Sequence, residues 1–204
     1  MNEQQNLKLK KLTQMITYMP HFVSTVAVVG IINFMVDREA GVVNLIRGLF
    51  SLDGVNYMGI SAAFRPLYVI SDIWQHMGWS AILYLAALSN VDAEILESAR
   101  IDGANRFQVI WYIDFPAILP TIVIMLILNC GSLLSVGFEK VYLMQNDNIR
   151  DVAQIISTYV YELGIKGGQF SYTTAIGLFN NVVNCIILFI VNWVANKVSG
   201  SSLM

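Results

Sequence analysis

The sequence predicts an all-α protein integral to a membrane, and three observations support this fold class. First, 56% of the 204 residues are hydrophobic and only 13% are charged, whereas soluble domains contain about 25% charged residues. Second, four apolar segments are each long enough to cross a bilayer, which takes about 20 helical residues. Third, no segment alternates polar and apolar residues as membrane strands do, so helices are expected to satisfy the backbone hydrogen bonds in lipid.

The predicted spans are residues 13–36, 67–88, 117–138 and 173–194. They belong to one predicted membrane domain that covers residues 1–204. The third and fourth spans carry no charge, whereas Asp72 and His76 lie near the start of the second. Small residues recur in the spans, as close helix–helix approach requires. Residues 1–11 are polar and show no cleavable signal peptide.

Two of the connections between spans contain shorter predicted helices. Residues 42–50 have helical apolar spacing and are expected to form an amphipathic helix in the membrane interface. Residues 152–163 form a second predicted helix, which the glycines at 164, 167 and 168 should end.

The connection at residues 89–116 has the most specific pattern. Asp92 is a predicted helix N-cap. Asp102-Gly103 predicts a turn, because glycine adopts positive φ without a Cβ clash. A second short helix should follow, present Phe107, Ile110 and Trp111 on one side, and stop at Pro116. Residues 93–115 would then form a compact knob of two amphipathic helices, which suits a groove on a partner.

The spacing in this connection resembles a known signature. Glu97-Ser98-Ala99, three residues, Gly103, nine residues and Ile113-x-Phe115-Pro116 are similar to Glu-Ala-Ala, three residues, Gly, nine residues, Ile-x-Leu-Pro. That pattern marks the permeases of binding-protein-dependent ATP-binding-cassette (ABC) importers. Ser98 and Phe115 depart from it conservatively. Ala99 and Asp102-Gly103-Ala104 resemble the carbohydrate-uptake branch, and residues 18–22, 70–74 and 174–180 resemble its complex-oligosaccharide permeases.

The resemblance implies a multi-pass helical bundle in the bacterial cytoplasmic membrane that forms half of an ATP-driven path for a carbohydrate, expected to be an oligosaccharide. The implied partners are nucleotide-binding ATPase subunits, a second homologous permease, an extracytoplasmic sugar-binding (lipo)protein and membrane lipid. The implied ATPase-coupling residues are Glu97, Ala99, Asp102, Gly103, Ala104, Phe107, Ile113 and Pro116. Permeases of this kind are usually longer and have more spans, so the chain is expected to be short at its N-terminus.

Orientation in the membrane has to come from this motif. Lys and Arg residues are equally numerous on the two predicted sides, so the positive-inside rule favours neither orientation. The resemblance places the connection at 89–116 and both termini in the cytoplasm.

Polar residues at membrane depth are candidates for the substrate path, because buried polar groups in a membrane usually face a cavity or a partner. The candidates are Asp72, Trp74, Gln75, His76, Trp79, Asn129, Asn180 and Asn184. Amides and charged groups can hydrogen-bond a sugar, and tryptophan can stack on it. The alternative is that the amides tie helices together and that Trp74 and Trp79 belong to an interfacial aromatic belt.

Other function classes lack their expected signals. A non-ABC secondary transporter or channel would favour inverted repeats, and a membrane enzyme would need paired acids or metal ligands. The chain has no phosphate-binding Gly-x4-Gly-Lys-Ser/Thr loop, so ATP hydrolysis belongs to a partner. We expect no cofactor, no metal and no nucleic acid. Cys130 and Cys185 lie in apolar runs and are expected to be small buried hydrophobes rather than a disulfide.

Overall fold

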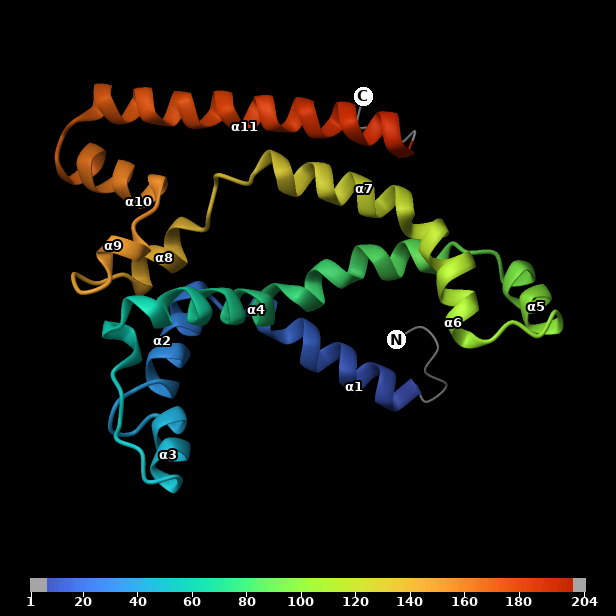
Figure 1. Ribbon diagram of the computed structural model, residues 1–204, viewed down its shortest axis with the longest axis horizontal. Coiled ribbons are helices and arrows are strands. Elements are labelled where there is room, and N and C mark those ends of the chain that lie inside the picture. The colour runs from blue at the N-terminus through green and yellow to red at the C-terminus, as the bar shows by residue number, and fades with distance from the viewer. Residues whose placement is uncertain (1–6, 200–204) are drawn as a thin grey trace. The chain divides into compact units, whose positions relative to one another are not determined.

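The computed structural model describes residues 7–199, and these residues form helices and connecting loops with no strand among them (Figure 1). The all-α prediction is therefore confirmed. Two compact units are present. Unit 1 contains the described residues up to Thr17, Gly78–Leu133 and the residues from Asn180 onward. Unit 2 contains Tyr18–Met77 and Leu134–Phe179. Helices α4 (Ser61–Ser89) and α11 (Phe170–Ser199) contribute to both.

Among the described residues, two helical segments are long and apolar enough to cross a membrane by themselves. One runs without a break from Arg106 to Gly131, and the other from Phe170 to Lys197. The second contains the whole predicted span 173–194. The helix that begins at Arg106 ends at Gly131, whereas the predicted span continues to residue 138. It ends there because the amides of Ser132 and Leu133 bond the carbonyls of Asn129 and Cys130 in a tight final turn. Hydropathy alone could not show this end, since apolar residues continue beyond it.

The first predicted span is bent rather than straight. Helix α1 (Leu7–Tyr18) leads into a 3₁₀ turn, η1 (Met19–Phe22), and α2 (Thr25–Met35) follows. The two helical pieces are bent by 102° at the break between Phe22 and Thr25. Pro20 lies at the start of the 3₁₀ turn, and Ser24 caps the new helix by accepting a bond from the Ala27 amide at 3.3 Å. The proline and the cap therefore divide an apolar stretch that looked continuous.

Helix α4 contains the predicted second span. It has 29 residues, long enough to cross a bilayer. It is not among the helices that qualify as spans by composition within the described residues, because polar residues such as Asp72, Gln75 and His76 interrupt its apolar run.

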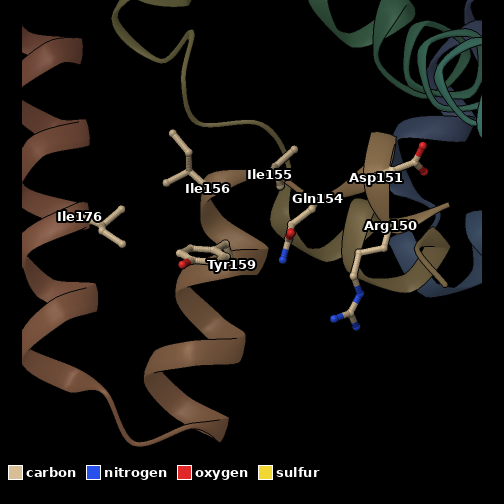
Figure 2. A pocket seen from close by; sticks show the side chains of 7 residues that line it. All are labelled: Arg150, Asp151, Gln154, Ile155, Ile156, Tyr159 and Ile176. Atoms are coloured by element: carbon tan, nitrogen blue, oxygen red, sulfur yellow. The ribbon is translucent and has the colours of Figure 1, made fainter. Parts of the chain in front are cut away.

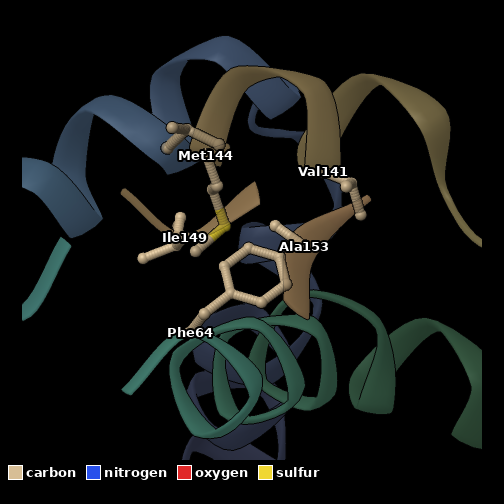
Figure 3. Close-up of a cluster of buried hydrophobic side chains, with 6 residues drawn as sticks. Phe64, Val141, Met144, Ile149 and Ala153 are labelled. Atoms are coloured by element: carbon tan, nitrogen blue, oxygen red, sulfur yellow. The ribbon is translucent and has the colours of Figure 1, made fainter. Parts of the chain in front are cut away.

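Unit 2 has its own hydrophobic core, shown in Figure 3. The buried residues are Val29, Phe64, Val141, Met144, Ile149 and Ala153. They come from α2, α4, α8 (Phe138–Met144), α9 (Arg150–Ala153) and the residue before α9. Helix α8 packs against both α2 and α10 (Ile156–Val160). This core fixes the segment that follows residue 138 onto α2 and α4.

Helix α3 (Val42–Leu49) confirms the helix expected at residues 42–50. Asn44 is buried and ties this helix to the chain on either side of it. Its Nδ2 donates to the carbonyls of Asp37 at 2.8 Å and Val55 at 2.9 Å, and its Oδ1 accepts from the Val55 amide at 2.9 Å. After α3, the 3₁₀ turn η2 (Tyr57–Gly59) leads into α4.

The helix expected at residues 152–163 is divided into three pieces. Helices α9 and α10 are separated at Gln154 and Ile155, and the π-helix η4 (Tyr161–Lys166) continues from α10. Gly164 lies inside η4 instead of ending it. A Cβ there would lie 2.6 Å from Thr173 Oγ1, so glycine permits the close approach of η4 to the start of α11.

Candidate functional site

The knob predicted at residues 93–115 begins with a capped helix. Helix α5 (Ala93–Ile101) starts at Asp92, whose Oδ1 accepts a hydrogen bond from the Glu94 amide at 3.0 Å. The predicted N-cap is therefore confirmed. Glu94 places negative charge in the first turn, where the helix dipole favours it.

The other end of α5 explains the spacing of the sequence signature. The amide of Ala104 donates to the Ala99 carbonyl at 2.9 Å, and that of Gly103 donates to the Arg100 carbonyl at 3.1 Å. These two bonds define a Schellman motif, in which the residue after the C-cap adopts positive φ. Gly103 occupies that position with φ of 78°. The interval from Ala99 to Gly103 is thus the interval between the first carbonyl of this motif and its positive-φ residue.

A second cap follows directly. Asn105 Oδ1 accepts from the Gln108 amide at 2.9 Å, and Gln108 Oε1 accepts from the Asn105 amide at 2.7 Å. This reciprocal capping box begins α6 (Arg106–Val109). Sequence reasoning missed it, although an asparagine followed three residues later by glutamine is a readable signal. The turn between α5 and α6 is therefore fixed by hydrogen bonds on both sides.

The two short helices enclose a groove of about 330 Å³. Five of the predicted coupling residues line it: Ala99, Asp102, Gly103, Ala104 and Ile113. Gln108, Val109 and Tyr112 complete the lining. Glu97, Phe107 and Pro116 lie outside the groove, so the structure brings most but not all of the predicted set together.

Pro116 does not end the second helix as expected. The helical path continues from α6 through a π-helix, η3 (Ile110–Asp114), into α7 (Phe115–Gly131). The Phe115 amide bonds the Ile110 carbonyl, which is the wider spacing of a π-turn. Pro116 has no amide hydrogen and, within an α-helix, would clash with the carbonyl four residues earlier. It lies in the first turn of α7, directly after the wider π-turn, so the chain can stay helical through it.

The outer surface of the knob is apolar and aromatic. Ile101 is 85% exposed, Phe107 83% and Tyr112 74%. The rings of Trp111 and Phe115 stack with centroids 5.3 Å apart. Large apolar groups that are exposed together indicate a surface that another molecule covers.

The side chain of Glu97 is exposed on α5 and forms no hydrogen bond or ion pair with any residue in the range 7–199. Such a carboxylate could contact a partner or bond across the turn to hold it closed. The backbone bonds of Gly103 and Ala104 already close the turn, so the structure gives Glu97 no part in closing it.

The substrate-path candidates in unit 2 mostly contact one another or the backbone. Asp72 Oδ1 lies 3.2 Å from Lys140 Nζ and 3.4 Å from His76 Nδ1. The ring of His76 meets that of His21 edge to face at 5.6 Å. Lys140 is buried and Asp72 is half-exposed, so this ion pair joins α8 to α4.

Gln75 is also buried, and its Nε2 donates to the Val23 carbonyl at 3.2 Å. Val23 lies in the break between η1 and α2, so Gln75 fastens the bend of the first predicted span to α4. This contact favours the structural alternative for Gln75.

The remaining candidates differ in exposure. Trp74, Trp79 and Asn129 are exposed, whereas Asn184 is buried. Asn180 differs from all of these, because its Oδ1 is buried without a hydrogen-bond partner among the described residues. A buried acceptor without a donor is costly unless another molecule supplies one.

A second groove lies in unit 2 and was not predicted. It has a volume of about 630 Å³, and its lining includes Arg150, Gln154, Tyr159 and Ile176. Figure 2 shows Tyr159 extending from α10 toward Ile176 on α11. Arg150 Nη2 lies 3.5 Å from Asp147 Oδ1 and 3.4 Å from Glu162 Oε1. Within residues 7–199, no group of three His, Cys, Asp or Glu side chains could hold a metal ion.

Comparison with known proteins gives consistent matches along the chain. The family model described as the binding-protein-dependent transport system inner membrane component matches residues 4–200. The chain is 42% identical over 197 residues to the polygalacturonan/rhamnogalacturonan transport system permease protein YteP of Bacillus subtilis (strain 168), covering 97% of this chain and 61% of that protein. It is 44% identical over 197 residues to protein LplB of the same strain, covering 97% and 62%.

A solved structure also matches. It is the crystal structure of a bacterial alginate ABC transporter in complex with an alginate pentasaccharide-bound periplasmic protein. The TM-score is 0.95 at 37% identity, covering 99% of this chain and 70% of that chain. The present chain thus spans between 61% and 70% of the length of these similar proteins.

Proposed function

Because the chain belongs to the family of binding-protein-dependent transport system inner membrane components, we propose that it is the transmembrane subunit of an ATP-driven importer and forms half of the path for an oligosaccharide. The observation that carries this proposal is the knob, whose caps and Schellman turn account for the spacing of the family signature. Relatives named for polygalacturonan transport and alginate transport support a carbohydrate substrate. Polygalacturonan and alginate are both polymers of sugar acids, which favours an acidic oligosaccharide.

The proposed partners follow from the same family. Two nucleotide-binding subunits would hydrolyse ATP in the cytoplasm, and this chain would catalyse no reaction itself. A second homologous permease would complete the path, and an extracytoplasmic sugar-binding protein would deliver the substrate. The groove and exposed aromatic surface of the knob would receive the ATPase. Since the helix is unbroken from Arg106 to Gly131, a displacement of the knob would reach the span directly.

The test of this function is reconstitution. We expect the chain to co-purify with nucleotide-binding subunits and a second permease. In proteoliposomes, ATP hydrolysis by this complex should rise when an oligosaccharide and its binding protein are added. The proposal would be contradicted if no nucleotide-binding subunit co-purified with the chain. It would also be contradicted if no oligosaccharide changed the rate of ATP hydrolysis by the complex.

We also propose that the chain is one membrane domain that crosses the bilayer four times, with the knob and both termini in the cytoplasm. A cysteine introduced at Asn105, which is exposed on the knob, should react with a membrane-impermeant maleimide only after the membrane is opened. A variant with Cys130 and Cys185 replaced by alanine provides the background. Labelling of intact cells from outside would show that the orientation is inverted.

The exposed and unsatisfied polar candidates remain proposals for the substrate path. We expect Asn180→Ala to lower oligosaccharide uptake several-fold while leaving membrane insertion unchanged, because its buried Oδ1 has no donor among the described residues and a sugar hydroxyl would supply one. Trp74→Ala should act in the same direction through loss of a stacking face. Gln75→Ala is the contrasting variant, since it should reduce the amount of folded protein instead. Normal uptake in both Asn180→Ala and Trp74→Ala would assign these residues to helix packing.

A further inference from the structure

Three aromatic rings of unit 2 gather in the segment between Gly131, where α7 ends, and the start of α11. The rings of Phe138 and Tyr142 on α8 stack with centroids 5.4 Å apart. The Tyr161 ring on η4 lies 5.2 Å from each of them, at steep angles of 57° and 73°. All three side chains are half-buried, so their rings are held in place while part of their surface stays accessible.

A lysine is held at the edge of this aromatic cluster. Lys166 Nζ donates to the Tyr142 hydroxyl at 2.7 Å and lies 5.5 Å from the centre of the Tyr161 ring. The side chain is exposed, and the hydrogen bond to Tyr142 raises the pKa of Lys166 above its ordinary value. The ammonium group therefore stays charged in any physiological medium.

Lys166 forms no short-range ion pair within the described part of the chain, although Glu162 attracts it at longer range. No carboxylate in residues 7–199 forms an ion pair with it. The nearby Glu162 is already engaged, because its Oε1 accepts from Arg150 Nη2 and from Gln145 Nε2, each at 3.4 Å. Lys166 is thus a positioned cation with a neutral hydrogen-bond partner.

We propose that Lys166, with the rings of Tyr142 and Tyr161, forms a binding site for the carboxylate-bearing sugar unit of an acidic oligosaccharide. The ammonium pairs with the carboxylate of a uronate, and the exposed ring surface packs against the C–H face of the same sugar. An ammonium over a flat apolar surface matches a uronate, which presents a carboxylate beside a ring of C–H groups. The site rests on the proposed function, since a cytoplasmic knob places this segment on the outer side, where substrate arrives.

The test uses the purified transporter with its ATPase subunits and two probes, trigalacturonate and its neutral methyl ester. Lys166→Gln should weaken equilibrium binding of trigalacturonate roughly threefold or more, as expected for loss of a partly exposed ion pair. Binding of the methyl ester should not change. Tyr142→Phe keeps the ring but removes the hydroxyl that holds the ammonium, so it should weaken binding of the acid by a smaller factor. Lys197→Gln is the matched control, because Lys197 Nζ also lies over an aromatic ring, 5.3 Å from the centre of Trp193.

The outcomes separate this site from the function on which it rests. If Lys166→Gln binds trigalacturonate as the unaltered transporter does, the site is wrong even where uptake of the oligosaccharide continues. If the transporter imports only neutral oligosaccharides, the acidic class and the site both fail while the importer function stands. If it imports no oligosaccharide and recovers no ATPase subunit, the proposed function itself fails.

Discussion

Replacing Gly103 by valine is expected to separate ATP hydrolysis from sugar uptake while the protein still inserts in the membrane. A Cβ at this position would meet no atom within 4 Å beyond its chain neighbours, so the added carbon itself has space. The cost of the substitution comes from the backbone, since φ is 78° and β-branched residues strongly avoid that region. The strain is on the order of 1–3 kcal/mol. This lowers the population of the closed turn by about 5- to 140-fold.

The measurement is retention of nucleotide-binding subunits in a pull-down, together with uptake per ATP hydrolysed. Gly103→Asn is the matched control, because asparagine tolerates positive φ. Ser51, which lies two residues after the end of α3, adopts a φ of 57° in the same kind of motif. A residue other than glycine therefore occupies the equivalent position elsewhere in this chain. Normal docking and normal coupling in Gly103→Val would mean that the knob is only a connector.

Charge reversal at Glu97 tests the same surface without touching the turn. Glu97→Lys should weaken retention of the ATPase, because this exposed carboxylate has no partner within residues 7–199. Glu94→Lys makes the same change of charge one turn earlier on α5 and should have a smaller effect. Equal loss in both variants would point to net charge rather than to a specific contact of Glu97.

Removing the carboxylate of Asp72 is expected to destabilise unit 2. The Lys140 side chain is 5% exposed and relies on Asp72 Oδ1, 3.2 Å away, as its counter-ion. Asp72→Ala leaves a buried ammonium unpaired. The loss is on the order of 1–3 kcal/mol, below that of a fully enclosed pair because Asp72 is 44% exposed. Thermal unfolding of the purified complex should therefore begin at a lower temperature. Asp151→Ala, which removes an exposed carboxylate that accepts a hydrogen bond from Ser61, is the control.

A double variant and the pH profile make this prediction specific. Lys140→Met combined with Asp72→Ala should recover most of the lost stability, since no buried charge is left alone. Burial lowers the pKa of Lys140, and Asp72 opposes that shift. In the Asp72→Ala variant, Lys140 should bind its proton less tightly in the folded state than in the unfolded state. Since the unfolded state then binds more protons, the stability of this variant should rise as pH increases toward the ordinary lysine pKa. If Asp72→Ala keeps its stability and loses only transport, Asp72 belongs to the substrate path.

The sequence predicted the knob because its determinants are local. Asp92 as a cap and Gly103 as a turn residue act within one turn of helix, and rules for short stretches describe them well. Contacts between residues far apart in the sequence could not be predicted from it. Nothing in the sequence pairs Asp72 with Lys140, or Tyr142 with Lys166, because those pairs depend on how α4, α8 and η4 pack. Hydropathy alone also did not show the bend within residues 13–36 or the helix end at Gly131, since it measures apolar content and does not register a cap or a final turn.

The π-turn at Ile110–Asp114 has a consequence for how chain length and direction are related. A helix rotates by about 100° for each residue, and a π-turn holds one more residue than an α-turn. Deletion of a single residue here would let the turn relax to α geometry without breaking the helix. An insertion at the same place could not be accommodated in this way, because the turn already holds one more residue than an α-turn. The direction of the knob relative to the span therefore depends on one residue that a regular α-helix would not hold.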